Sequence, residues 1–296
     1  MKGKIKRMKK AKMTFALLVA SVAGGVFAAE SPSFTYEPGE GVSYDENPLV
    51  TASASLTFES RYMTYGVIDG KDPIVRPYAE ITFCDWLYFS VDSIFDLTKG
   101  NGKGFGYGNR AGKYTTLDSY VGIAHEFEIS EDIGTLGVDL SYMYEYMPRY
   151  SNTQYVMAEF SLTGHWIEPT LYLERDIMLD NGTYASLTLG HTFDITEDLS
   201  LTPSIGQGLG NSLRTKGYFS EVGKVGYYDH GGLMDTTIRL DLEYAINSYL
   251  TFGAYVAYYD YLFDDKMREA AAAYNGEWGI DRTWNFVGGI SLTATF

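Results

Sequence analysis

Cysteine and histidine are scarce in this chain. Of its 296 residues, one is cysteine (Cys84) and four are histidine. A single cysteine excludes an internal disulfide, and the sequence contains no cluster of histidine or cysteine that would form a zinc site. The residue that directly follows position 28 is Ala29 and not a cysteine, which argues against a lipid-anchored lipoprotein.

Basic residues are few, and seven of the 23 lie within the first twelve positions. An apolar run at 13–27 follows, and Val26-Phe27-Ala28 places small residues at the −3 and −1 positions of a cleavage site. This pattern predicts a signal peptide at 1–28, cleaved after Ala28. The alternative, a membrane anchor, needs roughly 20 apolar residues, and this run is shorter. Residues 29–49 are acidic and contain three prolines, and we interpret them as an irregular periplasmic leader.

Removal of the signal peptide makes the chain strongly acidic. The formal net charge falls from −15 to −22, because residues 1–28 contain seven bases and no acids. Such a charge disfavours nucleic-acid binding. It is compatible with a preference for cations, or with simple repulsion between copies of the protein.

After residue 28 no apolar run is long enough to form a spanning helix, and alternation of apolar and polar residues dominates instead. At 233–246, for example, Ile238, Leu240 and Leu242 alternate with Arg239, Asp241 and Glu243. Such alternation predicts strands with one apolar face. Twelve segments show it, at 51–65, 75–83, 86–97, 115–129, 135–147, 154–163, 166–177, 183–195, 199–209, 233–246, 249–261 and 285–296.

Short and long connections alternate between these segments, which is typical of a transmembrane antiparallel up-and-down β-barrel. We therefore predict an all-β outer-membrane barrel of about 12 strands over 50–296, with short periplasmic turns and long external loops. A short helix is expected at 264–274, where alanine is frequent. The alternative, a soluble β-sandwich or lipocalin-like barrel, would turn the apolar faces inward.

The last predicted strand reaches Phe296. It should pair with the first strand, so that neither edge is left open. A terminal phenylalanine after alternating apolar residues also resembles the assembly signal of bacterial outer-membrane barrels. Aromatic residues near strand ends fit the two membrane interfaces, namely Tyr62, Trp86, Tyr146, Trp166, Tyr244 and Trp284.

The segment 54–81 resembles the start of the TorF-like, porin-like outer-membrane proteins of bacteria. In that pattern Ser-x-Tyr ends the first strand, and a glycine-containing loop leads to a strand that contains proline. The matching residues are Ser60, Tyr62, Gly66, Pro73 and Pro77. The resemblance covers about thirty residues and implies a barrel and a role in transport, without a substrate.

The polar faces of the strands are mostly acidic, and a wet lumen tolerates such an imbalance better than a dry core. Acidic rings select cations, which favours a passive channel for small polar or cationic solutes. Alternatively, arginines clamp carboxylates across a filled, non-conducting structural or surface-interaction barrel. The candidate lumen residues are Glu59, Arg61, Arg76, Glu80, Asp92, Asp118, Glu126, Asp139, Glu145, Glu159, Glu174, Arg239, Asp241 and Glu243.

An outer-membrane lipid-modifying enzyme is the third hypothesis. His125 and His191 fall on predicted outward faces, but Ser119 lies six residues from His125, about 20 Å along a strand. That separation is too large for a nucleophile and its base. We therefore predict no catalytic residues.

No cofactor or metal is expected either. Asp69 to Asp72 and Asp264-Asp265 lack the spacing of a calcium loop, and the glycine-rich segment 100–109 lacks the features of a P-loop. The expected partners are outer-membrane lipids, lipopolysaccharide and the barrel-assembly machinery. The solute, the openness of the lumen and the oligomeric state are left open.

Overall fold

The structure is a computed structural model that describes residues 49–98, 111–112, 114–130, 133–148, 151–219 and 230–296. The predicted signal peptide at 1–28 and, except for Leu49, the predicted leader at 29–49 lie outside the described residues. The glycine-rich segment 100–109 also lies outside them.

Twelve antiparallel strands form a closed barrel. Each strand pairs with the next along the chain, β1 pairs with β15, and β10 pairs with β12. The barrel strands are β1 (Val50–Glu59), β4 (Ile74–Phe83), β5 (Leu87–Asp96), β6 (Tyr114–Ser130), β7 (Gly134–Tyr146), β8 (Thr153–Thr163), β9 (Glu168–Asp176), β10 (Thr183–Gly190), β12 (Leu199–Gly210), β13 (Gly232–Asn247), β14 (Leu250–Asp260) and β15 (Asn285–Thr295).

The predicted fold class, strand number and terminal closure are confirmed. The main chain of Phe296 exchanges two hydrogen bonds with Ala52, of 2.8 and 3.1 Å, so the last residue is held in the ladder. The role of the Phe296 side chain in assembly stays a prediction. The predicted strand at 183–195 is interrupted after Gly190. Its last part, β11 (Phe193–Asp194), continues to pair with β12 in the same register as β10.

The outer face of the barrel is apolar all the way round. Every barrel strand exposes an aliphatic or aromatic side chain on that face, because alternate residues of a strand point to opposite sides. This arrangement is the reverse of a soluble β-sandwich. One such residue from each strand, in chain order, is Leu56, Ile81, Phe89, Val121, Leu140, Val156, Leu171, Leu187, Ile205, Ile238, Val256 and Ile290.

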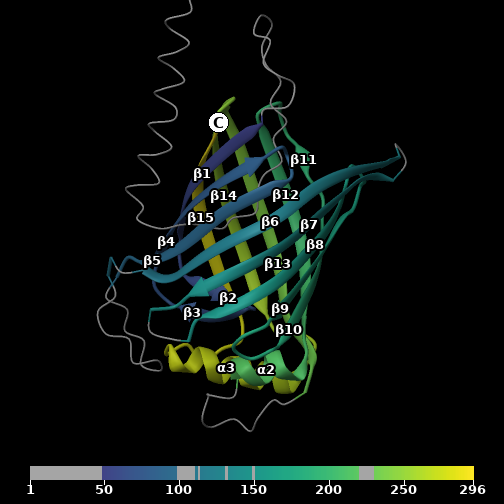
Figure 1. The fold of residues 1–296 in the computed structure, drawn as a ribbon. Coiled ribbons are helices and arrows are strands. Elements are labelled where there is room, and N and C mark those ends of the chain that lie inside the picture. Colours follow the sequence, from purple (N-terminus) through teal and green to yellow (C-terminus); the bar gives the residue numbers. More distant parts are fainter. Residues whose placement is uncertain (1–48, 99–110, 113, 131–132, 149–150, 220–229) are drawn as a thin grey trace, which may run out of the picture.

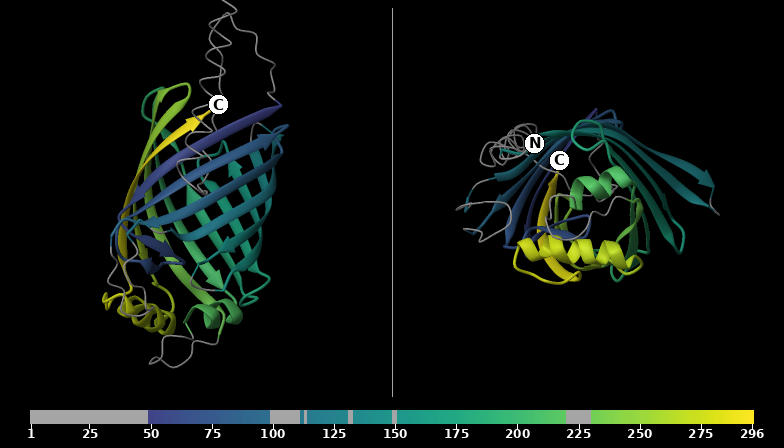
Figure 2. Two further views of the ribbon diagram at one scale, coloured as in Figure 1. Left: turned by 60° about the vertical axis from the view of Figure 1, so that its left-hand side comes forward. Right: turned by 90° about the horizontal axis from the view of Figure 1, so that it is seen from below.

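The two ends of the barrel differ. The short connections and the C-terminus lie at one end, here the turn end, and the long connections lie at the other, the loop end (Figures 1 and 2). β6 and β7 are long and project beyond their neighbours at the turn end (Figure 1). None of the described helices is long and apolar enough to cross a membrane.

A hairpin enters the barrel at the loop end. It consists of β2 (Tyr62–Thr64) and β3 (Val67–Gly70), joined by Tyr65 and Gly66, whose φ angles are 45° and 77°. Two consecutive positive φ angles are typical of a type I′ turn. The prediction that the first strand continues through Tyr62 with an outward ring is wrong, because the chain leaves the barrel wall after Glu59.

Two helices cover the hairpin at the loop end, α2 (Ser212–Phe219) and α3 (Asp265–Glu277) (Figure 2, right). α3 confirms the helix predicted at 264–274. The Asp264 carboxylate caps it, accepting from the main-chain N–H groups of Lys266 and Met267 at 3.0 and 3.1 Å. Asn211 caps α2 in the same way, accepting from the N–H of Arg214 at 3.0 Å. We call the β2–β3 hairpin, α2 and α3 together the plug.

Candidate functional site

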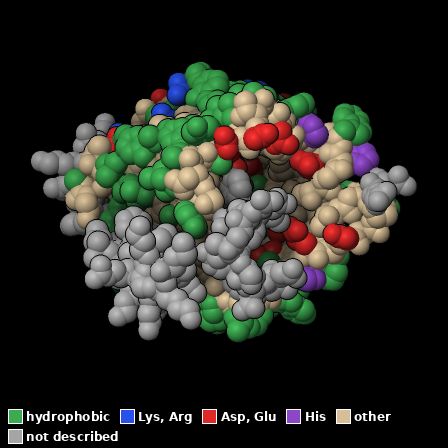
Figure 3. Space-filling model, turned by 90° about the horizontal axis from the view of Figure 1, so that it is seen from above, with side chains coloured by type: hydrophobic (Ala, Val, Ile, Leu, Met, Phe, Trp, Pro, Cys, Tyr) green, Lys and Arg blue, Asp and Glu red, His purple; other side chains and the backbone are tan. Residues whose placement is uncertain are grey.

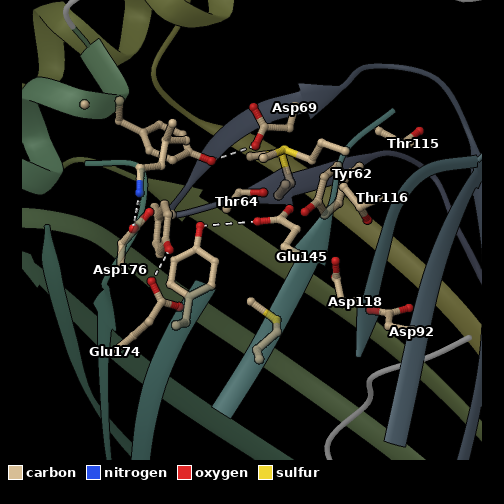
Figure 4. A pocket seen from close by; sticks show the side chains of 18 of the residues that line it. Tyr62, Thr64, Asp69, Asp92, Thr115, Thr116, Asp118, Glu145, Glu174 and Asp176 are labelled. Atoms are coloured by element: carbon tan, nitrogen blue, oxygen red, sulfur yellow. Dashed lines mark hydrogen bonds between the residues drawn. The ribbon is translucent and has the colours of Figure 1, made fainter. Parts of the chain in front are cut away.

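The barrel interior holds a cavity of about 1030 Å³ between the plug and the wall formed by β4 to β9. Residues of the plug border one side and inward-facing wall residues border the other (Figure 4). Lining residues also come from the loop end, such as Met147, Pro148 and Ser151, so the cavity extends toward that end. Five predicted lumen residues line it, namely Arg76, Asp92, Asp118, Glu145 and Glu174.

The plug lies to one side of the barrel. Val67 of the hairpin packs with Met234 of β13, with Met267 of α3 and with Tyr184 of β10 in one buried apolar cluster. The hydroxyl of Tyr261, just after β14, donates to the main-chain oxygen of Tyr65 at the tip of the hairpin. The plug is therefore held by the β10–β14 side, and the β4–β9 side stays hollow.

Arg76 joins three strands near the cavity. Its guanidinium donates to the Asp92 carboxylate on β5 at 2.8 Å and to the Glu59 carboxylate on β1 at 3.4 Å. Asp92 is almost completely buried, with 1% of its surface exposed. A buried carboxylate needs such a partner. This is the arginine clamp expected from sequence, although it crosses neighbouring strands and not the whole lumen.

Carboxylates from three neighbouring strands stand side by side on the cavity wall (Figure 4). Asp118 of β6 lies directly opposite Asp92 of β5 on one side and Glu145 of β7 on the other. Glu145 accepts a hydrogen bond from the hydroxyl of Tyr155 at 3.3 Å. Like charges in directly opposed positions repel each other, so this row attracts protons or cations.

Arg214, which the sequence analysis missed, ties the plug to the wall. It lies on α2 with 1% of its surface exposed, and its guanidinium contacts Glu174 at 2.9 Å and Asp180 at 3.2 Å. The hydroxyl of Tyr65 donates to the same Glu174 carboxylate. Burial raises the pKa of Asp180, whereas the nearby Arg214 acts in the opposite direction. The interior cations thus include a fourth arginine besides Arg61, Arg76 and Arg239.

Asp69 of β3 holds the hairpin to both helices. Its carboxylate accepts from the hydroxyl of Tyr218 on α2 at 2.8 Å and from that of Tyr274 on α3 at 2.5 Å. Burial raises the pKa of Asp69 above its ordinary value, and the two tyrosine hydroxyls act in the opposite direction. Asp69 is thus a structural contact of the plug.

The other predicted lumen residues lie away from the cavity. Toward the turn end, Asp139 accepts from the hydroxyl of Tyr88 at 3.0 Å, and Glu159 lies opposite Asp139 in register. Glu80 accepts from Tyr78 and Thr82.

On the facing wall, Arg239 pairs with Asp241 at 2.6 Å, and Glu243 follows on the same strand. Arg61 donates to the side chain of Asn285 at 3.0 Å, at the start of β15. Glu126 lies on the projecting part of β6 and is exposed to solvent. Seen from the turn end, acidic side chains gather around a hollow in the barrel (Figure 3).

The outward histidines lie among aromatic rings. The ring centroid of His125 is 5.2 Å from that of Trp86 and 4.7 Å from that of Phe127, and His191 is 4.5 Å from Phe193. Opposite His125 in register is Val138, which offers no nucleophile. Within the described residues no group of three or more His, Cys, Asp or Glu side chains is placed to hold a metal ion.

Solved structures of outer-membrane porins and channels have a similar barrel. The COG4313 outer membrane channel from Pseudomonas putida F1 is 10% identical over 88% of this chain and 100% of its own, with a TM-score of 0.48. The KdgM porin is 10% identical over 82% and 99%, with a TM-score of 0.47. The NanC porin is 9% identical over 81% and 98%, with a TM-score of 0.46.

No family model matches the chain, and no curated protein matches it. The resemblance of residues 54–81 to the TorF-like proteins therefore stays a prediction.

Proposed function

We propose that this protein is a porin-like channel of the bacterial outer membrane, through which small polar or cationic solutes diffuse passively. The observation that carries the proposal is the contrast between the two faces of one closed sheet. The outer face is apolar on all twelve barrel strands, and the inner face borders an acidic cavity. An apolar exterior with a polar interior is what a lipid bilayer requires of a barrel.

The proposed path is off-centre. It runs between the plug and the β4–β9 wall, past Arg76, Asp118 and Glu145, and continues along Asp139 and Glu159 to the turn end. The turn end faces the periplasm and the loop end faces outward, with lipopolysaccharide around the outer rim. Twelve strands lie between barrels filled by side chains and wide porins, so only small solutes should pass.

Single-channel recording tests the proposal. Protein extracted from bacterial membranes in detergent would be added to a planar bilayer with a salt gradient across it. We expect discrete current steps and a reversal potential on the cation-selective side. Changing both Asp139 to Asn and Glu159 to Gln should shift the reversal potential toward zero, because two fixed negative charges leave the path.

A second function, a non-conducting structural or surface-interaction barrel, is favoured by the plug, because the hairpin and two helices cover much of the loop end. Folded barrels that never produce current steps would establish this second function and exclude the channel. Folding is checked independently by the resistance of the barrel to SDS before heating.

A further inference from the structure

We infer that the cavity contains a binding subsite for an organic ammonium group, centred on Asp118. This inference deepens the proposed function, on which it rests, by naming the chemical class of the solute. The inference rests on a buried carboxylate oxygen without a hydrogen-bond partner among the described residues, and on the side chains that line the cavity around this oxygen.

The first observation concerns hydrogen bonding. Asp118 has 7% of its surface exposed, lines the cavity, and its Oδ1 atom receives no hydrogen bond from any residue that the structure describes. Thr116, two residues earlier on the same face of β6, also lines the cavity. Its Oγ1 atom is likewise buried without a partner in the described part of the chain. Buried polar atoms in native proteins are almost always satisfied, so an unpartnered carboxylate oxygen and an unpartnered hydroxyl beside one cavity indicate a polar partner that comes from outside the chain.

The second observation concerns charge. Asp118 stands between Asp92 and Glu145 in cross-strand register, and of these three carboxylates Asp92 is paired with Arg76. The row therefore carries more negative than positive charge. A solute with a positive charge and N–H donors would satisfy both unpartnered oxygens and also offset the charge. A neutral solute with O–H donors could satisfy the oxygens but would leave the negative charge uncompensated.

The third observation concerns the surroundings of the carboxylates. Two residues further toward the turn end, Tyr120 of β6 faces Met143 of β7, and both line the cavity. Tyr62 of the hairpin lines it from the plug side. Aromatic faces and a thioether favour the apolar carbons next to an ammonium nitrogen.

A hard metal ion is a poorer match for this pocket. Calcium takes six to eight oxygen ligands, and the described residues contain no cluster suited to a metal. The combination of carboxylates at one level with Tyr120 and Met143 at the next fits an amine attached to a short carbon chain.

Equilibrium binding tests the inference without requiring current. The full protein, purified in detergent, would be titrated calorimetrically with 1,4-diaminobutane and, separately, with butane-1,4-diol, which has the same carbon chain without charge. We expect saturable binding of the diamine and none of the diol. Asp118→Asn should weaken diamine binding by about tenfold or more, as expected for loss of a charged hydrogen-bond partner.

Glu126→Gln is the matched control. It also removes one negative charge from β6, at an exposed position about 26 Å from Asp118 along the strand, and it should change the affinity less than about twofold. If Asp118→Asn fails to fold, Glu145→Gln serves in its place, with the same expected loss.

Three results would overturn the inference: equal binding of diol and diamine, full diamine affinity in the folded Asp118 variant, or no saturable diamine binding. None of these depends on conductance. If the protein conducts but does not bind the diamine, the channel function is supported and the subsite is excluded. If it binds the diamine but does not conduct, the subsite is supported and the channel function is excluded.

Discussion

The two sides of the barrel interior are built from the same alternating strands, yet one is packed and the other is hollow. On the β10–β14 side, the inward residues include Tyr184 and Met234, and the plug buries them against Val67 and Met267. On the β4–β9 side, carboxylates and tyrosines border a cavity. The plug therefore covers the apolar inward residues, whose exposure to water would be unfavourable. It leaves the charged inward residues beside the cavity, because their burial would be unfavourable.

The comparison also shows how the plug is held on its two sides. Apolar contacts hold the hairpin on one side, and polar contacts connect it with the other. Arg214 and Tyr65 reach across to Glu174, and Asp69 binds two tyrosines within the plug. Substitutions of the residues that hold the plug should change the stability of the packed side and of the contacts with the hollow side by different amounts.

The largest effect is expected from Arg214→Met. This change leaves the carboxylates of Glu174 and Asp180 without their buried cation, and losing one partner of a buried ion pair costs about 3–5 kcal/mol. The plug should detach from the wall, and the free energy of unfolding in urea, followed by tryptophan emission, should fall by that amount.

Arg268→Met is the matched control for this prediction. Arg268 lies 3.8 Å from Asp260, with 44% of its side chain exposed. Asp260 is buried, but it also accepts from the hydroxyl of Tyr258 and the main-chain N–H of Tyr261, both at 2.8 Å. Losing the distant and partly exposed Arg268 should therefore cost only about 0–1 kcal/mol. Equal losses of stability in the two variants would show that Arg214 does not join the plug to the wall.

A smaller loss of stability is expected from Gly66→Ala at the tip of the hairpin. Gly66 has a φ of +77°, and an added Cβ would lie 2.4 Å from the Cβ of Asp235 on β13. The left-handed backbone costs a non-glycine residue about 1–2 kcal/mol, and overpacking adds about 1–3 kcal/mol. The apolar side of the interior should loosen, and unfolding should shift to lower urea concentration.

Gly279→Ala separates the two costs. Gly279 has the same φ of +77°, and no atom lies within 4 Å of its added Cβ. It should therefore show only the backbone cost. If Gly66→Ala is no more destabilising than Gly279→Ala, the hairpin tip is not tightly seated against β13.

Alternation along the sequence was sufficient to predict the barrel, its strand number and its closure, because a two-sided sheet between lipid and water imposes a period of two at each strand. Four of the candidate carboxylates, Asp92, Asp118, Glu145 and Glu174, border the cavity, but Asp69 and Asp180, which also border it, were not among the candidates. Alternation could not show that Asp92, Asp118 and Glu145 are neighbours, because register depends on turn geometry and on a bulge between Ile94 and Phe95.

The plug was not predictable in the same way. Its Tyr65-Gly66 turn lacks the Asn-Gly or Asp-Gly signal of a type I′ hairpin, and its strands are three and four residues long. Arg214 lies in a connection without periodicity, on a helix of eight residues that contains Gly217, a poor helix former. Its pairing with Glu174 and Asp180 is set by tertiary packing, and no local pattern marks it.

The smallest change in stability is expected from Asp69→Asn, and it should be visible only in how the unfolding free energy depends on pH. Because burial raises the pKa of Asp69 in the folded protein, the folded state holds its proton at pH values where the unfolded state has released it. The stability of the plug should then rise as the pH falls from this raised pKa toward the ordinary value of about 3.9, and it should decrease as the pH rises through the same window.

Asp69→Asn resembles the protonated carboxyl and cannot titrate, so its stability should lack this slope. The measurement is the difference in unfolding free energy between wild type and variant across that pH window. If the difference for Asp69→Asn is flat, water reaches this carboxylate, and the packed side of the interior is as wet as the acidic side.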